Sequence, residues 1–540
     1  MFKDQDNLLG IYLARLLAKK SGLALPEKER FADIVQSLVE FIGEGHSCLP
    51  LTEPEVLLLR TSNLVSSGGE TPLVLYNNSL YLHRYYHYEK RLALQMKNLA
   101  RREVAMMECG GFLDEAFGPE EREDLQRTAA QLAAGKALAI LSGGPGTGKT
   151  STVVRILGIL FQLLGLQTRV ALTAPTGKAA MRLQQSVVGA VDLLPFSKEI
   201  RQAIPGRAMT LHRLLGVRKY SPKFRHNRDN PLPWDVVIVD EASMVDLALM
   251  SKLVDALHDE TRLILLGDKD QLASVESGAV LADLIESLPQ NTVVLKKSYR
   301  FNEAIRVLAE TVNLNQAEKA WSLLQGAFDN IRLLETGRHE KLHQGYEQYL
   351  EYAGKVNREQ YPAVFQEFNK FRILCATRSG RMGVEAVNAL IENHGVTRYG
   401  YTEKWYPGKP VLIRRNDYTL DLYNGDIGIC LRDPEDGSMK IWFEEGDGAV
   451  KSYLPSRLPE FQTAYAMTIH KSQGSEFDDV VIVLPDEENL ILSRELLYTA
   501  ITRARKKIWL HSRKEMFMTA VSRKTRRSSG LAAMLRVGQE

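Results

Sequence analysis

The stretch KALAILSGGPGTGKTSTVVRILGIL, residues 136–160, decides the fold of this chain. A short apolar run leads into G-x-x-x-x-G-K-T from Gly143 to Thr150, and an apolar helical pattern follows. Strand, glycine-rich loop and helix in this order predict a phosphate-binding loop, because backbone N–H groups and the helix N-terminus then face phosphate oxygens. The expected nucleotide contacts are Gly143, Gly144, Pro145, Gly146, Thr147, Gly148, Lys149, Thr150 and Ser151. Lys149 would pair with the β- and γ-phosphates of ATP, and Thr150 would hold Mg²⁺.

Two further strand ends carry polar residues that suit the same site. In VVIVDEASMVD (236–246), Asp240 follows a buried strand, where open α/β sheets bind ligands. Asp240 is expected to complete the Mg²⁺ site and Glu241 to polarise the attacking water. In LLGDKDQLASVESGAVL (265–281), Gln271 is expected to contact the γ-phosphate and the water. The alternatives are a solvated acidic pair that caps a helix at Ala242, and a polar turn at GDKDQ.

Short apolar runs alternate with helical segments on either side of this loop, which predicts an α/β fold with parallel sheets. Residues 1–110 are expected to form a mostly helical N-terminal domain, with a strand–turn–strand at Asn77 and Asn78. The first α/β domain spans 111–290. The second spans 291–400 and 461–540, and residues 401–460 form a small antiparallel β module inserted in it, marked by Asn-Gly and Asp-Gly turns.

Composition narrows the class of protein. The 540 residues are 44% hydrophobic and 25% charged with a net charge of +3, so any nucleic-acid surface must be a local groove. Cys48, Cys109, Cys375 and Cys430 form no CxxC pair, which argues against a zinc site and a disulfide framework. With no apolar run of membrane-spanning length and no signal-peptide pattern, the expected location is the cytoplasm and no membrane partner is expected.

Seven further motifs follow the phosphate loop along the chain, so that eight motifs occur in order. They are GGPGTGKT, TAPTGKAA (173–180), TLHRLLG (210–216), VDEASMVD, LGDKDQLASVESG, KSYRF (297–301), TIHKSQGSEFD (468–478) and LLYTAITRARKK (496–507). This set resembles the superfamily 1 helicases and, more narrowly, the RecD family, the α subunits of exodeoxyribonuclease V (RecBCD), over about residues 111–530. The resemblance implies two RecA-like domains with ATP between them, an SH3-like insertion that includes YNGDIGI (423–429), and 5′–3′ movement on DNA.

The resemblance also implies roles for single residues. Arg503 and Arg300 match arginines that reach the γ-phosphate from the second domain, where a guanidinium stabilises charge that develops in the transition state. Gln126 resembles the glutamine that reads adenine, and Gly474 and Glu476 match positions near the ribose. The single-strand track is expected to include Thr173, Pro175, Thr176, Thr210, His212, Thr468, His470 and Lys471.

Partners follow from the same resemblance, and several alternatives stay open. RecB-like and RecC-like subunits, docked through the N-terminal domain, and single-stranded and duplex-end DNA are the expected partners. A stand-alone 5′–3′ DNA helicase, an RNA helicase and a non-moving ATP-binding scaffold are the alternatives. Residues 216–235 match a small hairpin or are a solvated loop, and the basic tail 522–530 would touch phosphate or a partner.

Overall fold

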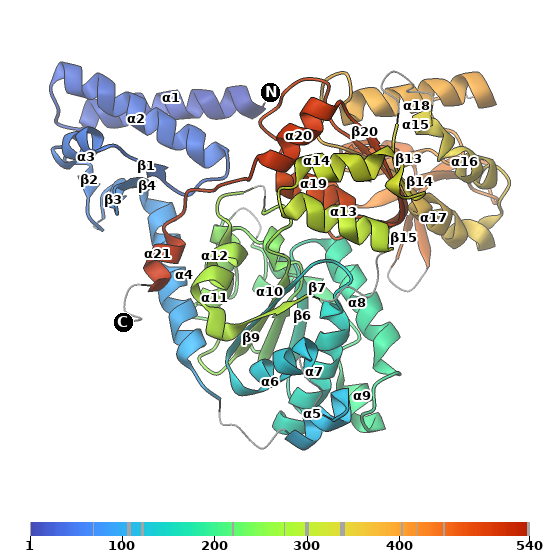
Figure 1. Cartoon of the computed structure of the whole chain (residues 1–540), viewed down its shortest axis with the longest axis horizontal. Coiled ribbons are helices and arrows are strands. Elements are labelled where there is room, and N and C mark those ends of the chain that lie inside the picture. The colour runs from blue at the N-terminus through green and yellow to red at the C-terminus, as the bar shows by residue number, and fades with distance from the viewer. Residues whose placement is uncertain are drawn as a thin grey trace.

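The computed structural model has three lobes (Figure 1). The structure describes residues 2–68, 70–104, 110–119, 124–218, 221–274, 276–296, 302–334, 341–400, 403–417, 419–445 and 449–536. The N-terminal lobe lies at the upper left of Figure 1, the first α/β unit below and the second at the upper right.

The N-terminal lobe is mainly helical, as predicted, and also contains a small sheet. Its elements are α1 (Phe2–Lys20), α2 (Leu25–Gly43), β1 (Leu49–Pro50), α3 (Glu53–Arg60), β2 (Val65–Ser66), β3 (Leu73–Tyr76), β4 (Ser79–Leu82) and α4 (His83–Arg101), with sheet order β1-β4-β3-β2. Asn77 and Asn78 both have positive φ, 45° and 55°, which is the geometry of a tight type I′ hairpin. The predicted strand–turn–strand is therefore confirmed.

The first α/β unit contains a parallel sheet in the order β10-β5-β9-β8-β6-β7, which confirms the predicted parallel sheet. Its strands are β5 (Leu138–Gly143), β6 (Val170–Ala174), β7 (Ala208–Thr210), β8 (Val236–Val239), β9 (Arg262–Gly267) and β10 (Thr292–Leu295). Its helices are α5 (Gly110–Phe117), α6 (Leu125–Gly135), α7 (Lys149–Leu164), α8 (Gly177–Val191), α9 (Lys198–Ala203), α10 (Leu211–Leu215), η1 (Ala242–Met244), α11 (Leu247–Asp255), α12 (Val280–Ser287) and η2 (Pro289–Asn291).

Alternate residues of each central strand enter different cores, because successive side chains point to opposite faces of a sheet. Val237 and Val239 pack with α4, α11 and α12, whereas Val236 and Ile238 pack with α6, α7 and α8. Burial on both faces explains why these strands are continuous apolar runs in the sequence.

The second α/β unit also has a parallel sheet, in the order β11-β20-β19-β12-β18. Its strands are β11 (Ile331–Leu333), β12 (Phe371–Cys375), β18 (Ala466–Thr468), β19 (Phe477–Val483) and β20 (Ala504–His511). Its helices are α13 (Glu303–Asn313), α14 (Ala317–Ser322), η3 (Leu323–Ala327), α15 (Lys341–Gln344), α16 (Glu347–Ala353), η4 (Arg358–Gln360), α17 (Tyr361–Lys370), α18 (Val384–Tyr399), η6 (His470–Ser472), α19 (Arg494–Ile501) and α20 (Lys514–Ser522).

An antiparallel sheet interrupts the second unit between α18 and β18, as predicted. Its order is β16-β15-β14-β13-β17, from β13 (Pro410–Ile413), β14 (Ile427–Arg432), β15 (Met439–Glu444), β16 (Val450–Tyr453) and β17 (Phe461–Thr463), with η5 (Pro455–Arg457). Arg213 of the first unit pairs with Asp421 of this insertion at 2.9 Å, so the sheet lies against both α/β units.

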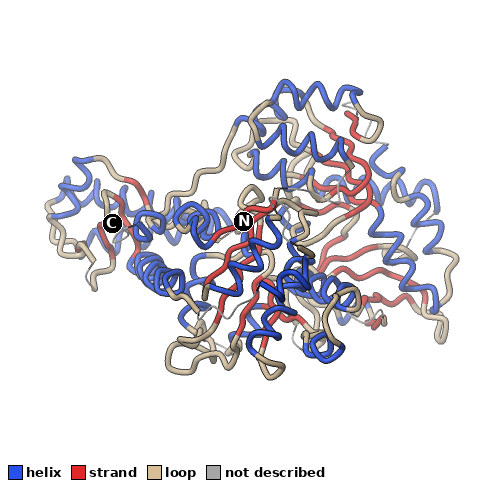
Figure 2. Tube along the Cα trace, turned by 60° about the horizontal axis from the view of Figure 1, so that its bottom comes forward, coloured by secondary structure: helices blue, strands red, loops and turns tan. Residues whose placement is uncertain are grey.

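The basic tail runs back across the molecule to the N-terminal lobe (Figures 1 and 2). Arg527 donates to the backbone oxygens of Glu276 and Gly278 at 2.6 and 2.8 Å. Buried Glu89 of α4 accepts from Ser529 Oγ and the Gly530 N–H, both at 3.0 Å. The segment then ends in α21 (Leu531–Arg536), packed on α4 and α12. The contact expected with phosphate or a partner is therefore replaced, for Arg527, by one within the chain.

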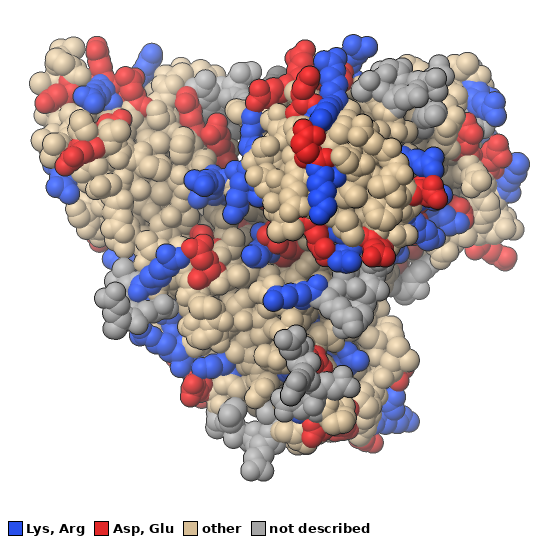
Figure 3. Space-filling model, in the orientation of Figure 1, with Lys and Arg blue, Asp and Glu red and all other residues tan. Residues whose placement is uncertain are grey.

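Lys, Arg, Asp and Glu are interspersed over the face shown in Figure 3, in keeping with the small net charge. None of the helices in the described part of the chain is both long and apolar enough to span a bilayer.

Candidate active site

The phosphate loop joins β5 to α7 and depends on glycine at its tightest points. Gly146 and Gly148 have φ of 78° and 84°, a left-handed conformation that costs little only without a Cβ. A Cβ at Gly148 would also lie 2.4 Å from Nε2 of Gln126. Lys149 Nζ donates to the backbone oxygens of Gly143 and Gly144 at 2.5 and 3.0 Å. The lysine therefore lies across the loop, where phosphate oxygens could replace these two acceptors.

The two predicted acids lie at the carboxyl end of β8, beside this loop. The Asp240 N–H donates to the Thr173 oxygen of neighbouring β6 at 2.8 Å, which fixes where the strand ends. Glu241 has φ of 52°, an uncommon conformation for a residue with a Cβ and one often found at functional sites. Burial, with the neighbouring Glu241 charge, raises the pKa of Asp240 to about 6, while Lys149 acts in the opposite direction.

The second α/β unit contributes a buried arginine to the cleft. Arg503 lies between α19 and β20 and is 1% exposed. Its guanidinium donates to Thr499 O and Ser475 O, both at 3.1 Å, and to Gln271 Oε1 at 3.0 Å. Gln271 in turn donates to Asp268 at 3.1 Å. A chain of hydrogen bonds therefore crosses from the end of β9 in the first unit to Arg503 in the second.

Two further bonds join the units at the same place. Tyr498 OH donates to Asp268 Oδ2 at 3.1 Å, and the Leu272 N–H donates to Thr499 Oγ1 at 2.9 Å. Tyr498 was not among the residues expected to act at the site. Its place in the same LLYTAITRARKK motif as Arg503 is the signal that could have singled it out.

Glu476 connects three parts of the cleft. Its carboxylate pairs with Arg182 of α8 in the first unit and, at 3.1 Å, with Arg505 of β20. Gly474, two residues before, has φ of 70°. Arg182 is a cleft residue that the sequence reasoning missed. It lies three and four residues from Ala179 and Ser186, which line the same pocket, so helical spacing from TAPTGKAA could have found it.

These residues enclose one pocket of about 330 Å³, at the small end of the ~300–1,000 Å³ typical of ligand sites. Of the predicted residues, the pocket is lined by Pro145, Gly146, Gly148, Lys149, Thr150, Ser151, Asp240, Glu241, Gln271, Gly474, Glu476 and Arg503. Gly143, Gly144 and Thr147 form the body of the loop, and Gln126 donates to Thr147 O at 3.4 Å. Arg300 lies outside the described residues.

The residues expected along the DNA track fall into two groups. Thr173 is fully buried and its hydroxyl donates to Ile238 O at 2.7 Å, because β6 is an interior strand. The expected contact of this hydroxyl with DNA is therefore wrong. Thr176 and Thr210 instead cap α8 and α10, accepting from the N–H groups of Ala179 and Arg213.

The remaining track residues lie at or just after the ends of β6, β7 and β18, with His212 in α10 and His470 and Lys471 in η6. Pro175 follows β6, and Thr468 Oγ1 accepts from the Lys471 N–H at 3.3 Å. Burial lowers the pKa of Lys471 to about 8 and, with Arg527 nearby, that of His470 to about 4. The His212 ring packs edge-on to Phe224 at 5.7 Å.

The charged stretch 216–235 is folded back on the first unit within its described residues. Val217 and Phe224 form an antiparallel bridge, and Asn227 and Asn230 form a second one. The Arg225 N–H donates to Gly216 O at 2.8 Å. These bridges favour the small hairpin over the solvated loop.

Comparison with known proteins agrees with this geometry. Residues 126–277 match the AAA domain family and residues 463–511 the UvrD-like helicase C-terminal domain family. The chain is 38% identical to the RecBCD enzyme subunit RecD of Mycolicibacterium smegmatis, over 90% of this chain and 88% of that one. It is 35% identical to the same subunit of Haemophilus influenzae, over 86% and 81%. The ATP-dependent RecD2 DNA helicase of Deinococcus radiodurans is 32% identical, over 92% of this chain and 67% of that protein.

Identity above 30% across most of both chains shows the family, and the phosphate loop, the two acids and the arginine of the second unit that line one pocket agree with it. The chain belongs to the RecD family of superfamily 1 ATP-dependent DNA helicases.

Proposed function

We propose that this chain hydrolyses Mg²⁺–ATP in the cleft to move 5′ to 3′ along single-stranded DNA, as a motor of a RecBCD-type helicase–nuclease in double-strand break repair. The observation that carries the proposal is the bond between Gln271 and Arg503 across the cleft. Gln271, which is positioned to sense the γ-phosphate, thereby contacts Arg503 of the second unit. Hydrolysis that requires both residues can occur only when the cleft is closed, and this requirement couples the chemistry to movement.

Each residue has a distinct part in the reaction. Lys149 exchanges its bonds to the loop oxygens for bonds to the phosphates. Glu241 orients and polarises the attacking water, and Arg503 neutralises charge that develops on the transferred phosphoryl group. Arg182 forms an ion pair with Glu476, and both side chains line the pocket. A bound nucleotide that contacts either side chain would compete with this ion pair. Gln126 lies beside the loop, where an adenine reader is required.

The donors present fit a magnesium ion. Asp240 and the Thr150 hydroxyl line the same pocket, and Mg²⁺ prefers oxygen ligands. Burial of Asp240 beside Glu241 disfavours the charged carboxylate, and a bound cation would relieve that cost. When bound, the ion would neutralise charge on the β- and γ-phosphates.

The N-terminal lobe is the proposed docking site for RecB-like and RecC-like subunits. One face of α1 packs inward through Ala14, Leu17 and Ala18. The opposite face exposes Leu8, Leu9, Tyr12 and Leu16, between 52% and 65% exposed, at helical spacing. Such an apolar stripe marks an interaction surface. It is typical of a helix that binds in a partner's groove.

The docking surface can be tested by substitution. Leu8→Ser, Tyr12→Ser and Leu16→Ser together should abolish co-purification with the partner subunits and leave ATP binding intact. Leu490→Ser is the control, because Leu490 is 80% exposed but lies on the second α/β unit. Equal co-purification of the triple variant and the control would refute docking through α1.

The motor itself is tested by unwinding of a partial duplex that carries either a 5′ or a 3′ single-stranded tail. With the partner subunits present, the unwinding that is lost in Lys149→Gln should start from the 5′ tail. Unwinding from the 3′ tail that is also lost in Lys149→Gln would refute the polarity, which follows from the family. If the isolated chain unwinds as fast as the complex, it is a stand-alone helicase, and no preference for DNA over RNA would favour an RNA helicase.

A further inference from the structure

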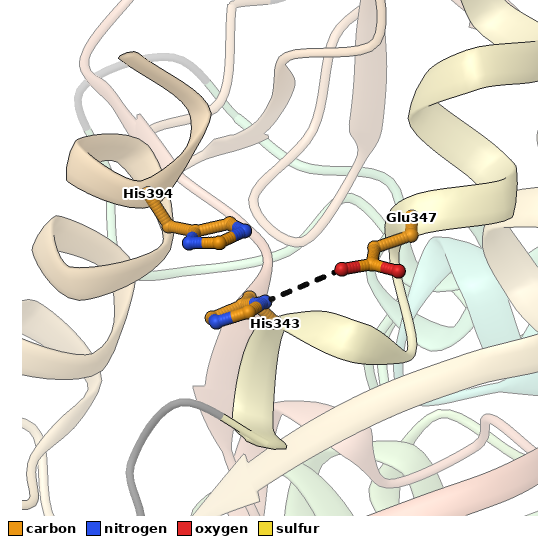
Figure 4. Close-up of side chains that lie close together, drawn as sticks. All are labelled: His343, Glu347 and His394. Carbon is orange, nitrogen blue, oxygen red and sulfur yellow. Dashed lines mark ion pairs between the residues drawn. The ribbon is translucent and has the colours of Figure 1, made fainter. Parts of the chain in front are cut away.

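Three metal-ligating side chains converge in the second α/β unit, away from the nucleotide cleft (Figure 4). His343 lies in α15, Glu347 begins α16 and His394 lies in α18. The imidazole rings of His343 and His394 stack with centroids 3.3 Å apart and planes 11° from parallel. Glu347 Oε1 lies 3.8 Å from His343 Nδ1, and one ligand atom from each residue lies within 4.8 Å of the others.

Two contacts in this cluster are open to a further ligand. The 3.8 Å between Glu347 and His343 is longer than a hydrogen bond, so the carboxylate faces the imidazole without binding it closely. Nε2 of His394 is buried and, among the described residues, has no hydrogen-bond partner. A buried polar atom without a partner costs folding free energy, and a bound cation is one way to satisfy it.

We propose that His343, Glu347 and His394 bind a divalent transition-metal ion, with Zn²⁺ the best match. Two imidazole nitrogens and one carboxylate oxygen are the ligands of borderline cations, whereas Mg²⁺ and Ca²⁺ prefer oxygen alone. Three protein ligands leave a fourth tetrahedral position for water. The sequence did not suggest this site, because its residues lie in no short motif and all the cysteines are far apart.

The side chains must move together to close around an ion. Tetrahedral ligands about 2.1 Å from Zn²⁺ lie about 3.4 Å apart, so ligand atoms that are up to 4.8 Å apart must approach by as much as about 1.4 Å. One ring must also turn about its Cβ–Cγ bond, because the lone pairs of two stacked imidazoles lie in near-parallel planes and do not meet at one point. Glu347 retains room to move, since its side chain is 37% exposed.

The site would fasten two helical segments of the second unit together. His343 and Glu347 belong to α15 and α16, and His394 to α18, which is separated from them by α17 and β12 in sequence. On α18, Asn388 donates to Thr463 O at 2.9 Å and to Ala466 O at 3.1 Å. The metal would therefore anchor the helix that holds the strand leading into Thr468–Lys471.

The test is a Zn²⁺ titration of the full chain, first freed of metal with a chelator, by calorimetry and thermal unfolding. One Zn²⁺ per chain and a rise in Tm are expected, and Mg²⁺, which would bind at Asp240 and Thr150, should not compete with Zn²⁺ for this site. His394→Gln should abolish binding, and Glu347→Gln, a partly exposed site that tolerates change, should weaken it at least about tenfold. DNA-stimulated ATPase should be unchanged in Glu347→Gln, because none of the three residues lines the nucleotide pocket.

A second histidine pair provides the matched control. His83 and His87 of α4 are also close, with ring centroids 4.1 Å apart, but have no third ligand among the described residues. His83→Gln with His87→Gln should leave Zn²⁺ binding intact. No binding by the wild-type chain, or binding that survives in both His394→Gln and Glu347→Gln, would overturn the proposal.

Discussion

Replacing Arg503 by alanine tests the coupling of the two α/β units most directly. The guanidinium is 1% exposed and donates to Thr499 O, Ser475 O and Gln271 Oε1. At about 1 kcal/mol per hydrogen bond, losing these three lowers the free energy of unfolding by about 3 kcal/mol. An arginine at the transferring phosphate contributes about 10³–10⁵ in kcat, or roughly 4–7 kcal/mol of transition-state stabilisation. The catalytic loss should therefore exceed the structural one.

The assay is DNA-stimulated ATP hydrolysis at saturating ATP, at a temperature where circular dichroism shows the variant folded. Arg503→Ala should lower kcat at least about 10³-fold while nucleotide still binds. Arg503→Lys keeps the charge but not the fork of donors, and should recover only part of the loss. Lys507→Ala, at an exposed position on β20, should match the wild type. A folded Arg503→Ala that retains kcat within threefold would refute the assignment.

Four further outcomes follow from other features of the structure. Glu241→Gln should lower kcat by about 10²–10⁴ and keep ATP affinity, and normal turnover in this variant would exclude Glu241 as the base. Because the pKa of Asp240 is raised to about 6, protonation of this carboxylate competes with Mg²⁺ binding below that pH. The affinity of the chain for Mg²⁺ should therefore fall about fourfold from pH 7.5 to pH 5.5. The Asp240→Asn variant should show no such change. The same raised pKa means that Asp240 stabilises the fold at acidic pH and loses that contribution as the pH rises through about 6. Arg527→Ala should lower the free energy of unfolding, measured by thermal denaturation, by about 2 kcal/mol, because two hydrogen bonds to backbone oxygens are lost. Arg526→Ala, at an exposed position, should not lower it. Equal effects of the two substitutions would exclude the tail contact as the cause.

Local pattern was enough for the parts of the site that are contiguous in sequence. The phosphate loop needs only a strand, a glycine-rich turn and a helix, and Asp240 needs only the end of a buried strand. Both parallel sheets and the antiparallel insertion were predicted from the texture of apolar runs and turns, since burial on two faces produces a different pattern from burial on one.

Contacts between distant segments could not be predicted in the same way. Arg182 and Glu476 are 294 positions apart, and no local rule pairs them. Thr173 was misassigned because the direction of a hydroxyl depends on which strands flank it, and β6 is interior. The tail was expected to touch phosphate or a partner because it is basic, whereas Arg527 donates to backbone oxygens of the loop after Gln271.

The returning tail restricts how the motor can swing. The chain crosses between the α/β units once after β10, and again between Thr525, whose N–H donates to Glu495 at 3.0 Å, and Arg527, bound to the first unit. Two crossings limit the relative rotation of the units more than one crossing would. If ATP hydrolysis moves the units as proposed, rotation about the line that joins the two crossings would stretch neither connection.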